Sequence, residues 1–163
     1  MRRAQKILLL VIVVIVILAL ALRLVRRGRG PVRLAAESCD ATLWNHVYQP
    51  ERLKVIEACV VVEGRVVSLR REGDGDIHIR LDVEERAALN LYNLLHAHGD
   101  LVVELICESG AKRADAIAAC AGFTPQVAVP SAGDRVRVTG AYVADRDNGW
   151  NEIHPVTRIE ILR

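Results

Sequence analysis

The chain has 163 residues, of which 52% are hydrophobic, only 4% are aromatic, and nearly equal numbers are basic and acidic. Eight of the 22 Lys and Arg residues and none of the 20 Asp and Glu residues lie before position 34, so residues 34–163 carry a net charge near −6. An acidic segment with few aromatic side chains disfavours non-specific nucleic-acid binding, which depends on basic residues at phosphates and on base stacking.

Residues 7–22 are apolar without interruption. Sixteen helical residues span about 24 Å, and Leu24 and Val25 extend the run towards the thickness of a bilayer. The pattern predicts a single membrane-spanning anchor over residues 7–25. The alternative is a signal peptide cleaved after Ala19-Leu20-Ala21.

The predicted domain organisation follows from changes in composition. It consists of an anchor (1–26), a basic Gly- and Pro-containing linker (27–34), a lead-in (35–56) and a folded domain (57–163). Arginines after the apolar run favour a cytoplasmic domain by the positive-inside rule. Disulfides among the four cysteines would favour the opposite side, and we expect the extracytoplasmic one.

Alternating apolar and polar residues predict five strands. The first is long and follows a short helical or irregular lead-in. Gly64 and a slip of the alternation at Val66–Val67 indicate a bulge and a bend in it. The second covers residues 77–83 after the turn sequence GDGD, the third 101–107, and the last two run from about 135 and about 151. Helices are expected within 84–98 and 111–122, and an extended piece at 126–130.

This order of elements resembles the OB-fold, a small five-stranded Greek-key barrel. The resemblance rests on Val60-x-Val62-x-Gly64-x-Val66 and on Gly133-Asp134-x-Val136-x-Val138-x-Gly140. More closely, DGDIHIRL (74–81) and GWNEIHPV (149–156) are similar to motifs of small, largely uncharacterised prokaryotic OB-like proteins. The resemblance implies that residues 72–76 and 144–150 flank a ligand-binding mouth.

The cysteines allow three pairings. In the barrel that the resemblance implies, Cys59 and Cys107 lie at opposite ends of parallel strands, so Cys39–Cys59 and Cys107–Cys120 are the favoured pairs. Four buried free thiols are the alternative. No Cys-x-x-Cys spacing indicates a zinc site.

Polar side chains near the expected mouth are the candidate binding residues. They are Asp74, Asp76, His78, Arg80, Asn148, Trp150, Glu152 and His154. Trp150, Glu152 and His154 alternate and so share one strand face, with Trp150 as a stacking anchor. The structural alternatives are that GDGD is only a hairpin turn with His78 exposed on the strand, and that Trp150 covers the barrel end while Glu152 and His154 hydrogen-bond to backbone groups. An outward row of Arg70, Arg71, Arg80, Arg135 and Arg137 is either a phosphate-binding stripe or a solvated face.

Three functions compete. The first is a membrane-tethered, non-catalytic binding module for an unknown small ligand or protein partner, without a cofactor or metal. The second is a metal-dependent hydrolase or nuclease that uses Asp76, His78, Glu152 and His154. The third is a structural envelope protein. No nucleophile elbow or phosphate loop indicates catalysis.

Overall fold

The computed structural model describes residues 11–15, which are helical, and residues 38–163. The predicted linker lies outside the described residues, as does the predicted anchor apart from residues 11–15. Within the described ranges, no helix has both the length and the apolar character needed to cross a membrane. The account below concerns residues 38–163.

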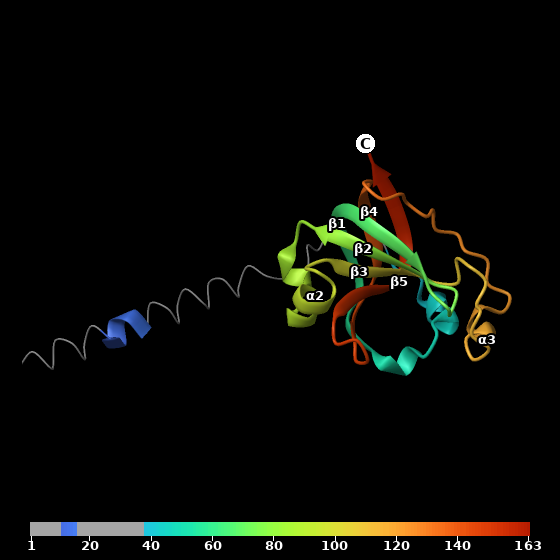
Figure 1. Ribbon diagram of the computed structural model, residues 1–163, viewed down its shortest axis with the longest axis horizontal. Helices are drawn as coiled ribbons and strands as arrows, with labels where there is room; N and C mark the ends of the chain where they lie inside the picture. Colours follow the sequence, from blue (N-terminus) through green and yellow to red (C-terminus); the bar gives the residue numbers. More distant parts are fainter. Residues whose placement is uncertain (1–10, 16–37) are drawn as a thin grey trace, which may run out of the picture. The chain divides into compact units, whose positions relative to one another are not determined.

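The protein is mainly β, with five strands and a few short helices (Figure 1). The strands are β1 (Leu53–Arg71), β2 (Ile77–Val83), β3 (Leu101–Leu105), β4 (Arg135–Asp145) and β5 (Asn151–Leu162). They pair in the order β1-β2-β3-β5-β4, and β4 pairs with β1 to close the ring. Only β3 and β5 pair in parallel. The predicted number and order of strands are confirmed.

The helical elements are shorter than the sequence suggests. They are η1 (Ala41–His46), η2 (Pro50–Arg52), η3 (Arg86–Ala88), α2 (Leu91–His96) and α3 (Ile117–Cys120). The prediction of a helix over 111–122 is correct only for its last turn, and residues 126–130 form no strand. High alanine content favours a helix only weakly, and here tertiary contacts determine the path of the segment.

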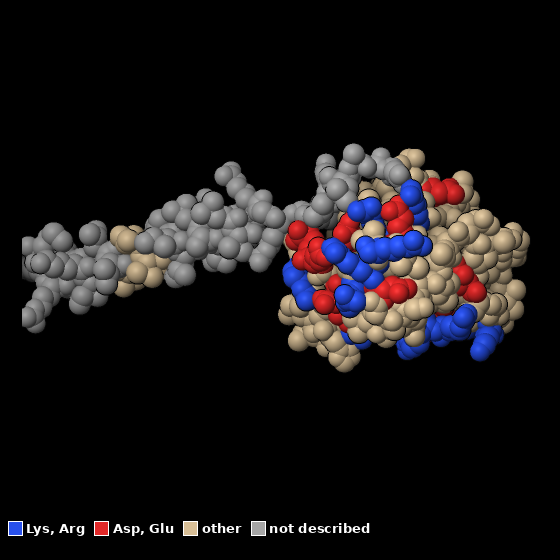
Figure 2. Space-filling view, turned by 90° about the horizontal axis from the view of Figure 1, so that it is seen from above, with Lys and Arg blue, Asp and Glu red and all other residues tan. Residues whose placement is uncertain are grey.

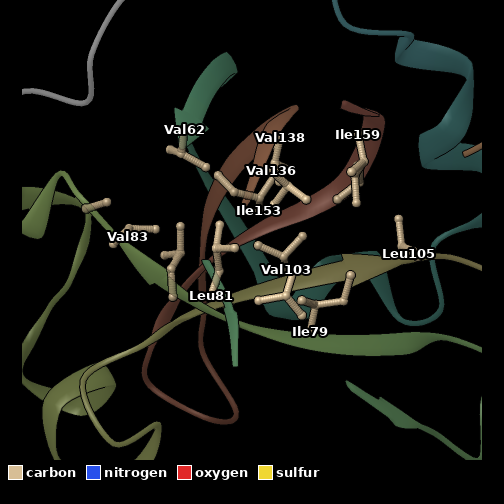
Figure 3. Close-up of a cluster of buried hydrophobic side chains, with 14 of the residues drawn as sticks. Val62, Ile79, Leu81, Val83, Val103, Leu105, Val136, Val138, Ile153 and Ile159 are labelled. Carbon is tan, nitrogen blue, oxygen red and sulfur yellow. The ribbon is translucent and has the colours of Figure 1, made fainter. Parts of the chain in front are cut away.

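The interior of the ring is filled by the inward-facing residues of all five strands. Figure 3 shows Val62 of β1, Ile79, Leu81 and Val83 of β2, Val103 and Leu105 of β3, Val136 and Val138 of β4, and Ile153 and Ile159 of β5. Most of them are under 5% exposed. Burial of each such side chain contributes about 1.5–3 kcal/mol, so this cluster is the main source of stability.

The ladders contain several register shifts, and two of them lie at positions that the sequence or a glycine marks. The β1–β2 register shifts between Val66 and Ser68, which confirms the predicted bulge. In the β4–β5 ladder, Gly140 pairs with Val156 and Tyr142 with Ile153, so two β5 residues face one on β4. A Cβ on Gly140 would lie 2.6 Å from Pro155 O, so the close approach at this bulge requires glycine.

A second apolar cluster lies outside the ring. It joins Ala141 and Val143 of β4 to Val47 and Leu53, with Trp44, Ile106, Cys107 and Phe123 around them. Both predicted disulfides, Cys39–Cys59 and Cys107–Cys120, are present. They fasten the segments that carry η1 and α3, and His46 Nδ1 lies 2.8 Å from Ala119 O between these two helices. The two segments, 38–52 and 106–123, form a cover over part of the ring's outer surface.

The predicted arginine stripe is not a continuous basic surface. Arg135 pairs with Glu63 and Glu84, and Arg137 pairs with Glu63 and Glu160. Figure 2 accordingly shows basic and acidic side chains interspersed over the face in view. Each exposed pair contributes at most about 1 kcal/mol, and the mixture supports the prediction of a solvated outer face.

Candidate functional site

A row of ionisable side chains crosses the outer face of β2, β3 and β5. His78, Glu104 and His154 alternate with the core residues Ile79, Val103 and Ile153, so they point away from the interior. Glu104 pairs with His78 across the ladder, with Oε1 2.8 Å from His78 Nε2. Its Oε2 lies 2.8 Å from His154 Nδ1. The three strands therefore place a carboxylate between two imidazoles.

Further charged side chains, from residues at or next to the ends of strands, surround this row. Asp76 directly precedes β2, and its Oδ2 lies 4.0 Å from His154 Nε2. Arg52, at the end of η2, pairs with Asp145 and lies 3.6 Å from Glu104 and 3.8 Å from Glu152. We call Arg52, Asp76, Glu104, Asp145, Glu152 and His154 the charged cluster.

The carboxylates and the histidine of the charged cluster are sealed from solvent, while the Arg52 side chain is 12% exposed. Glu104, Glu152 and His154 are 0% exposed, and Asp76 and Asp145 are 2% and 1% exposed. The cover supplies part of this seal, because the backbone N–H of Cys107 donates to Asp76 Oδ1 at 2.8 Å. Charges buried to this extent are tolerated only when they are paired.

The ion pairing shifts the pKa values of His154 and Glu104. Burial alone would lower the pKa of His154, but Glu104 and Glu152 beside the ring raise it to about 10. Burial alone would raise the pKa of Glu104, but His154 and His78 hold it well below its usual range. Both groups are therefore ionised near neutral pH.

The remaining carboxylates are less well compensated. Burial raises the pKa of Asp76 to about 6, although His154 and the Cys107 N–H oppose the rise. Burial and the nearby Glu104 raise the pKa of Glu152 as well. Burial is the main cause of both upward shifts.

An open pocket of about 330 Å³ adjoins the charged cluster on the same outer face. We call it the β2–β3 pocket. Two arginines, two histidines, a serine and a tryptophan supply its polar and aromatic lining, and none of the described residues that line it is acidic. The lining residues are Ser68, Arg70, His78, Ile79, Arg80, His96, Ala97, Val102 and Trp150.

Two hydrogen-bonding side chains connect the pocket with the charged cluster. His78 lines the pocket and contacts Glu104. Trp150 also lines it, and its Nε1 donates to Glu152 Oε2 at 2.8 Å. The opposite oxygen of Glu152 lies 3.1 Å from His154 Nδ1. A change in His78 or Trp150 at the pocket wall is therefore expected to affect Glu104 or Glu152 directly, because each pair is in contact.

The eight predicted binding residues fall into three groups. His78, Arg80 and Trp150 line the β2–β3 pocket. Asp76, Glu152 and His154 belong to the charged cluster. Asp74 and Asn148 are turn residues: Asp74 Oδ1 accepts from the N–H of Asp76, and Asn148 donates to Asp145. The last two thus act as the structural alternative predicts.

Several residues of the site were not predicted. Arg52, Glu104 and Asp145 complete the charged cluster, and Ser68 and His96 complete the pocket, which also includes Arg70 of the predicted arginine row. One of them left a sequence signal: Glu104 is the only acid within the apolar strand LVVELIC. A lone carboxylate in such a run needs a buried partner.

Comparison with known proteins assigns no family. No protein-family model matches the chain, and no curated protein matches it significantly. The resemblance of the two motifs to prokaryotic OB-like proteins stays a prediction, and the functional argument rests on the site itself.

Proposed function

We propose that residues 38–163 form an OB-like Greek-key barrel that binds a small anionic ligand with an apolar or planar part in the β2–β3 pocket. The observation that carries the proposal is the lining of this pocket, which has several N–H and O–H donors and no acid in a segment of net charge near −6. Its volume of about 330 Å³ lies in the range of small-molecule sites.

The pocket's donors are held in place by groups outside the lining. Arg80 Nε and Nη2 donate to Asp100 Oδ2 at 3.1 and 2.8 Å, and Arg70 Nε lies 2.5 Å from Glu72 Oε1. A guanidinium has five N–H donors, so these bonds orient each arginine without using all its donors. Trp150 offers a planar surface beside them. A carboxylate or phosphate on an aromatic or aliphatic body fits this arrangement.

Location on the ring supports the same site. In OB-folds the outer face of the second and third strands, between the loops that follow strands one and four, is the usual binding surface. The β2–β3 pocket lies on the corresponding strands, and Trp150 ends the loop between β4 and β5.

The hydrolase alternative is less well supported. Asp76, Glu152 and His154 are at most 2% exposed, and only His78 of the proposed catalytic set reaches the pocket. A substrate has no path to the other three while the cover is in place. The arrangement favours binding without catalysis.

We further propose that the domain is tethered through residues 7–25 on the extracytoplasmic side of the membrane. The two disulfides support this, because such bonds persist in oxidising compartments. Thiol labelling of intact cells tests the side. Labelling that requires a reductant agrees with the proposal, and rapid labelling of all four cysteines without one would rule out the disulfide pairs and remove this support for the extracytoplasmic side.

Ligand binding can be tested with fragments observed at the tryptophan indoles. Phenyl phosphate is titrated into the ¹⁵N-labelled full-length chain, with benzyl alcohol as the uncharged comparison. We expect phenyl phosphate to shift the Trp150 indole signal saturably and to leave that of Trp44 in place. Arg70→Gln should weaken this binding about tenfold, equivalent to loss of one charge-assisted contact.

The neighbouring Arg71→Gln is the matched control, since Arg71 is exposed but does not line the pocket. It should bind phenyl phosphate like the unmodified chain. Equal effects of Arg70→Gln and Arg71→Gln, or equal binding of benzyl alcohol, would sink the proposed site.

A further inference from the structure

Asp76, Glu104 and His154 form a convergent set of ligand-type atoms that the pocket does not use. They come from three different strands or strand ends, and one oxygen or nitrogen from each lies within 4.8 Å of the others. All three side chains are at most 2% exposed. A second set, Asp76 with Cys107 and Cys120, shares one member, but its two cysteines are joined in a disulfide and offer no thiolate.

Two atoms of this set face each other without a partner. Asp76 Oδ2 and His154 Nε2 lie 4.0 Å apart, and neither has a hydrogen-bond partner. The other atom of each group is engaged: Asp76 Oδ1 accepts from the N–H of Cys107, and His154 Nδ1 lies 3.1 Å from Glu152 Oε1. A buried unpaired polar atom costs about 1–3 kcal/mol. Both side chains are thus fixed with their unpartnered atoms directed at the same space.

We propose that this space binds a divalent first-row transition-metal ion, with Asp76, Glu104 and His154 as its ligands. Bonds from Zn²⁺ to imidazole nitrogen and carboxylate oxygen are about 2.0–2.2 Å long. Tetrahedral ligands on such bonds lie about 3.4 Å apart, so His154 Nε2 and Asp76 Oδ2, now 4.0 Å apart, need to approach only slightly to bind the ion. The imidazole ligand favours Zn²⁺ or Mn²⁺ over Ca²⁺, which prefers oxygen ligands alone.

Glu104 is suited to be the third ligand. Its oxygens form ion pairs at 2.8 Å with nitrogens of His78 and His154, and each carboxylate oxygen has a second lone pair that can face the ion. Glu152 has a different part, because its contact with His154 Nδ1 leaves Nε2 as the metal-binding nitrogen. Metal-binding histidines usually donate their other N–H to a carboxylate in this way.

Charge balance points in the same direction. The charged cluster has four carboxylates, on Asp76, Glu104, Asp145 and Glu152. Opposite them stand three cationic groups, Arg52, His154 and the adjoining His78. The carboxylates therefore outnumber the cationic side chains, and a dication between Asp76 and His154 would add positive charge where the carboxylates converge. The inference does not depend on a ligand in the β2–β3 pocket.

Metal content and spectroscopy test the proposal on the full-length chain, purified in detergent with a tag that contains no histidine. Because the ligands are sealed, the chain is refolded with its disulfides intact in the presence of Zn²⁺, Mn²⁺ or Ca²⁺ and then dialysed. We expect one Zn²⁺ or Mn²⁺ per chain and no retained Ca²⁺. Zn²⁺ should move the ¹⁵N signal of His154 Nε2, and Mn²⁺ should broaden signals around Asp76 and Glu104.

Asp76→Asn removes one anionic ligand at constant volume and should weaken Zn²⁺ binding about 100-fold or more. Asp100→Asn is the matched control, a nearly buried acid that pairs with Arg80 outside the set, and it should keep full metal content. Equal metal retention in both variants would overturn the assignment. So would less than about a tenth of an equivalent in the unmodified chain, a result that does not depend on whether Asp76→Asn folds.

Discussion

One outer face of the ring carries two polar regions that differ in their access to solvent and in the charge of their side chains. The charged cluster is covered by residues 38–52 and 106–123, and its carboxylates and His154 are at most 2% exposed. The β2–β3 pocket is open, with the Arg70 and Arg80 side chains 73% and 26% exposed. The same strands thus present a sealed region suited to an ion and an open one suited to a ligand.

The difference arises from what packs on each region. The cover brings apolar residues such as Val47 and Ile106, and it is held by two disulfides. Beside the pocket, α2 contributes only its C-terminal end, through His96 and Ala97. The expected consequence is that the two regions respond differently to substitution.

The largest effect is expected from Glu104→Gln. It removes the carboxylate that directly contacts both His78 and His154, and breaking a buried ion pair by removing one partner typically costs about 3–5 kcal/mol. Urea unfolding monitored by circular dichroism gives the change in unfolding free energy. Glu160→Gln, in an ion pair with Arg137 whose members are 33% and 37% exposed, is the control and should cost less than about 1 kcal/mol. Equal losses in the two variants would show that burial of the cluster does not matter.

The next effect is expected from removing the Cys107–Cys120 disulfide by a double change to alanine. A cross-link of this length contributes about 3 kcal/mol in the chain-entropy model. The loss should also loosen the cover locally. Hydrogen exchange should speed up at the backbone amide of position 107, which donates to Asp76 in the unmodified chain, and stay unchanged at β2 amides beside the pocket. If hydrogen exchange speeds up equally in the cover and beside the pocket, the two regions are not stabilised separately.

Sequence patterns predicted the ring well because each strand alternates in burial. Inward positions such as Ile79, Val103 and Ile153 are apolar, and this period of two is visible without any tertiary information. The disulfides followed from the inferred positions of the strands. The charged cluster was only partly predictable, since Arg52 and Glu104 are 52 positions apart and their contact depends on how the lead-in folds over the ring. Burial by a cover leaves no local periodicity.

A smaller effect is expected from Trp150→Phe, which tests the connection between the regions. The substitution keeps an aromatic ring in the pocket but removes the Nε1 donor to Glu152. Hydrogen bonds to charged groups contribute about 1.5–3 kcal/mol, so we expect a loss near 2 kcal/mol in urea unfolding. Trp44→Phe makes the same change in the cover and is the comparison. If the two variants lose the same stability, the indole of Trp150 does not support the charged cluster.

The smallest effect concerns a neutral polar network that contrasts with the charged one. Tyr142 donates to Ala88 O at 2.8 Å and accepts from Asn151 Nδ2 at 2.6 Å, and Asn151 bonds to Asn93 through its N–H. This network fastens the helical insertion after β2 to the ring without any ion pair. Its one titratable member is Tyr142, whose pKa is raised by burial, although the bond from Asn151 opposes the rise.

A raised pKa means that the folded state keeps the phenol proton to higher pH than the unfolded chain. The corresponding stability is complete below the unfolded pKa of about 10 and is lost as pH rises above it. Tyr142→Phe should therefore cost about 1 kcal/mol at pH 7, from the lost hydrogen bond, but reduce the further loss between pH 9 and pH 11. Urea midpoints at these pH values measure both quantities, with Tyr92→Phe on exposed α2 as control. If Tyr142→Phe loses as much stability between pH 9 and pH 11 as the unmodified chain, other groups cause the alkaline loss. The neutral network would then contribute only its hydrogen bonds.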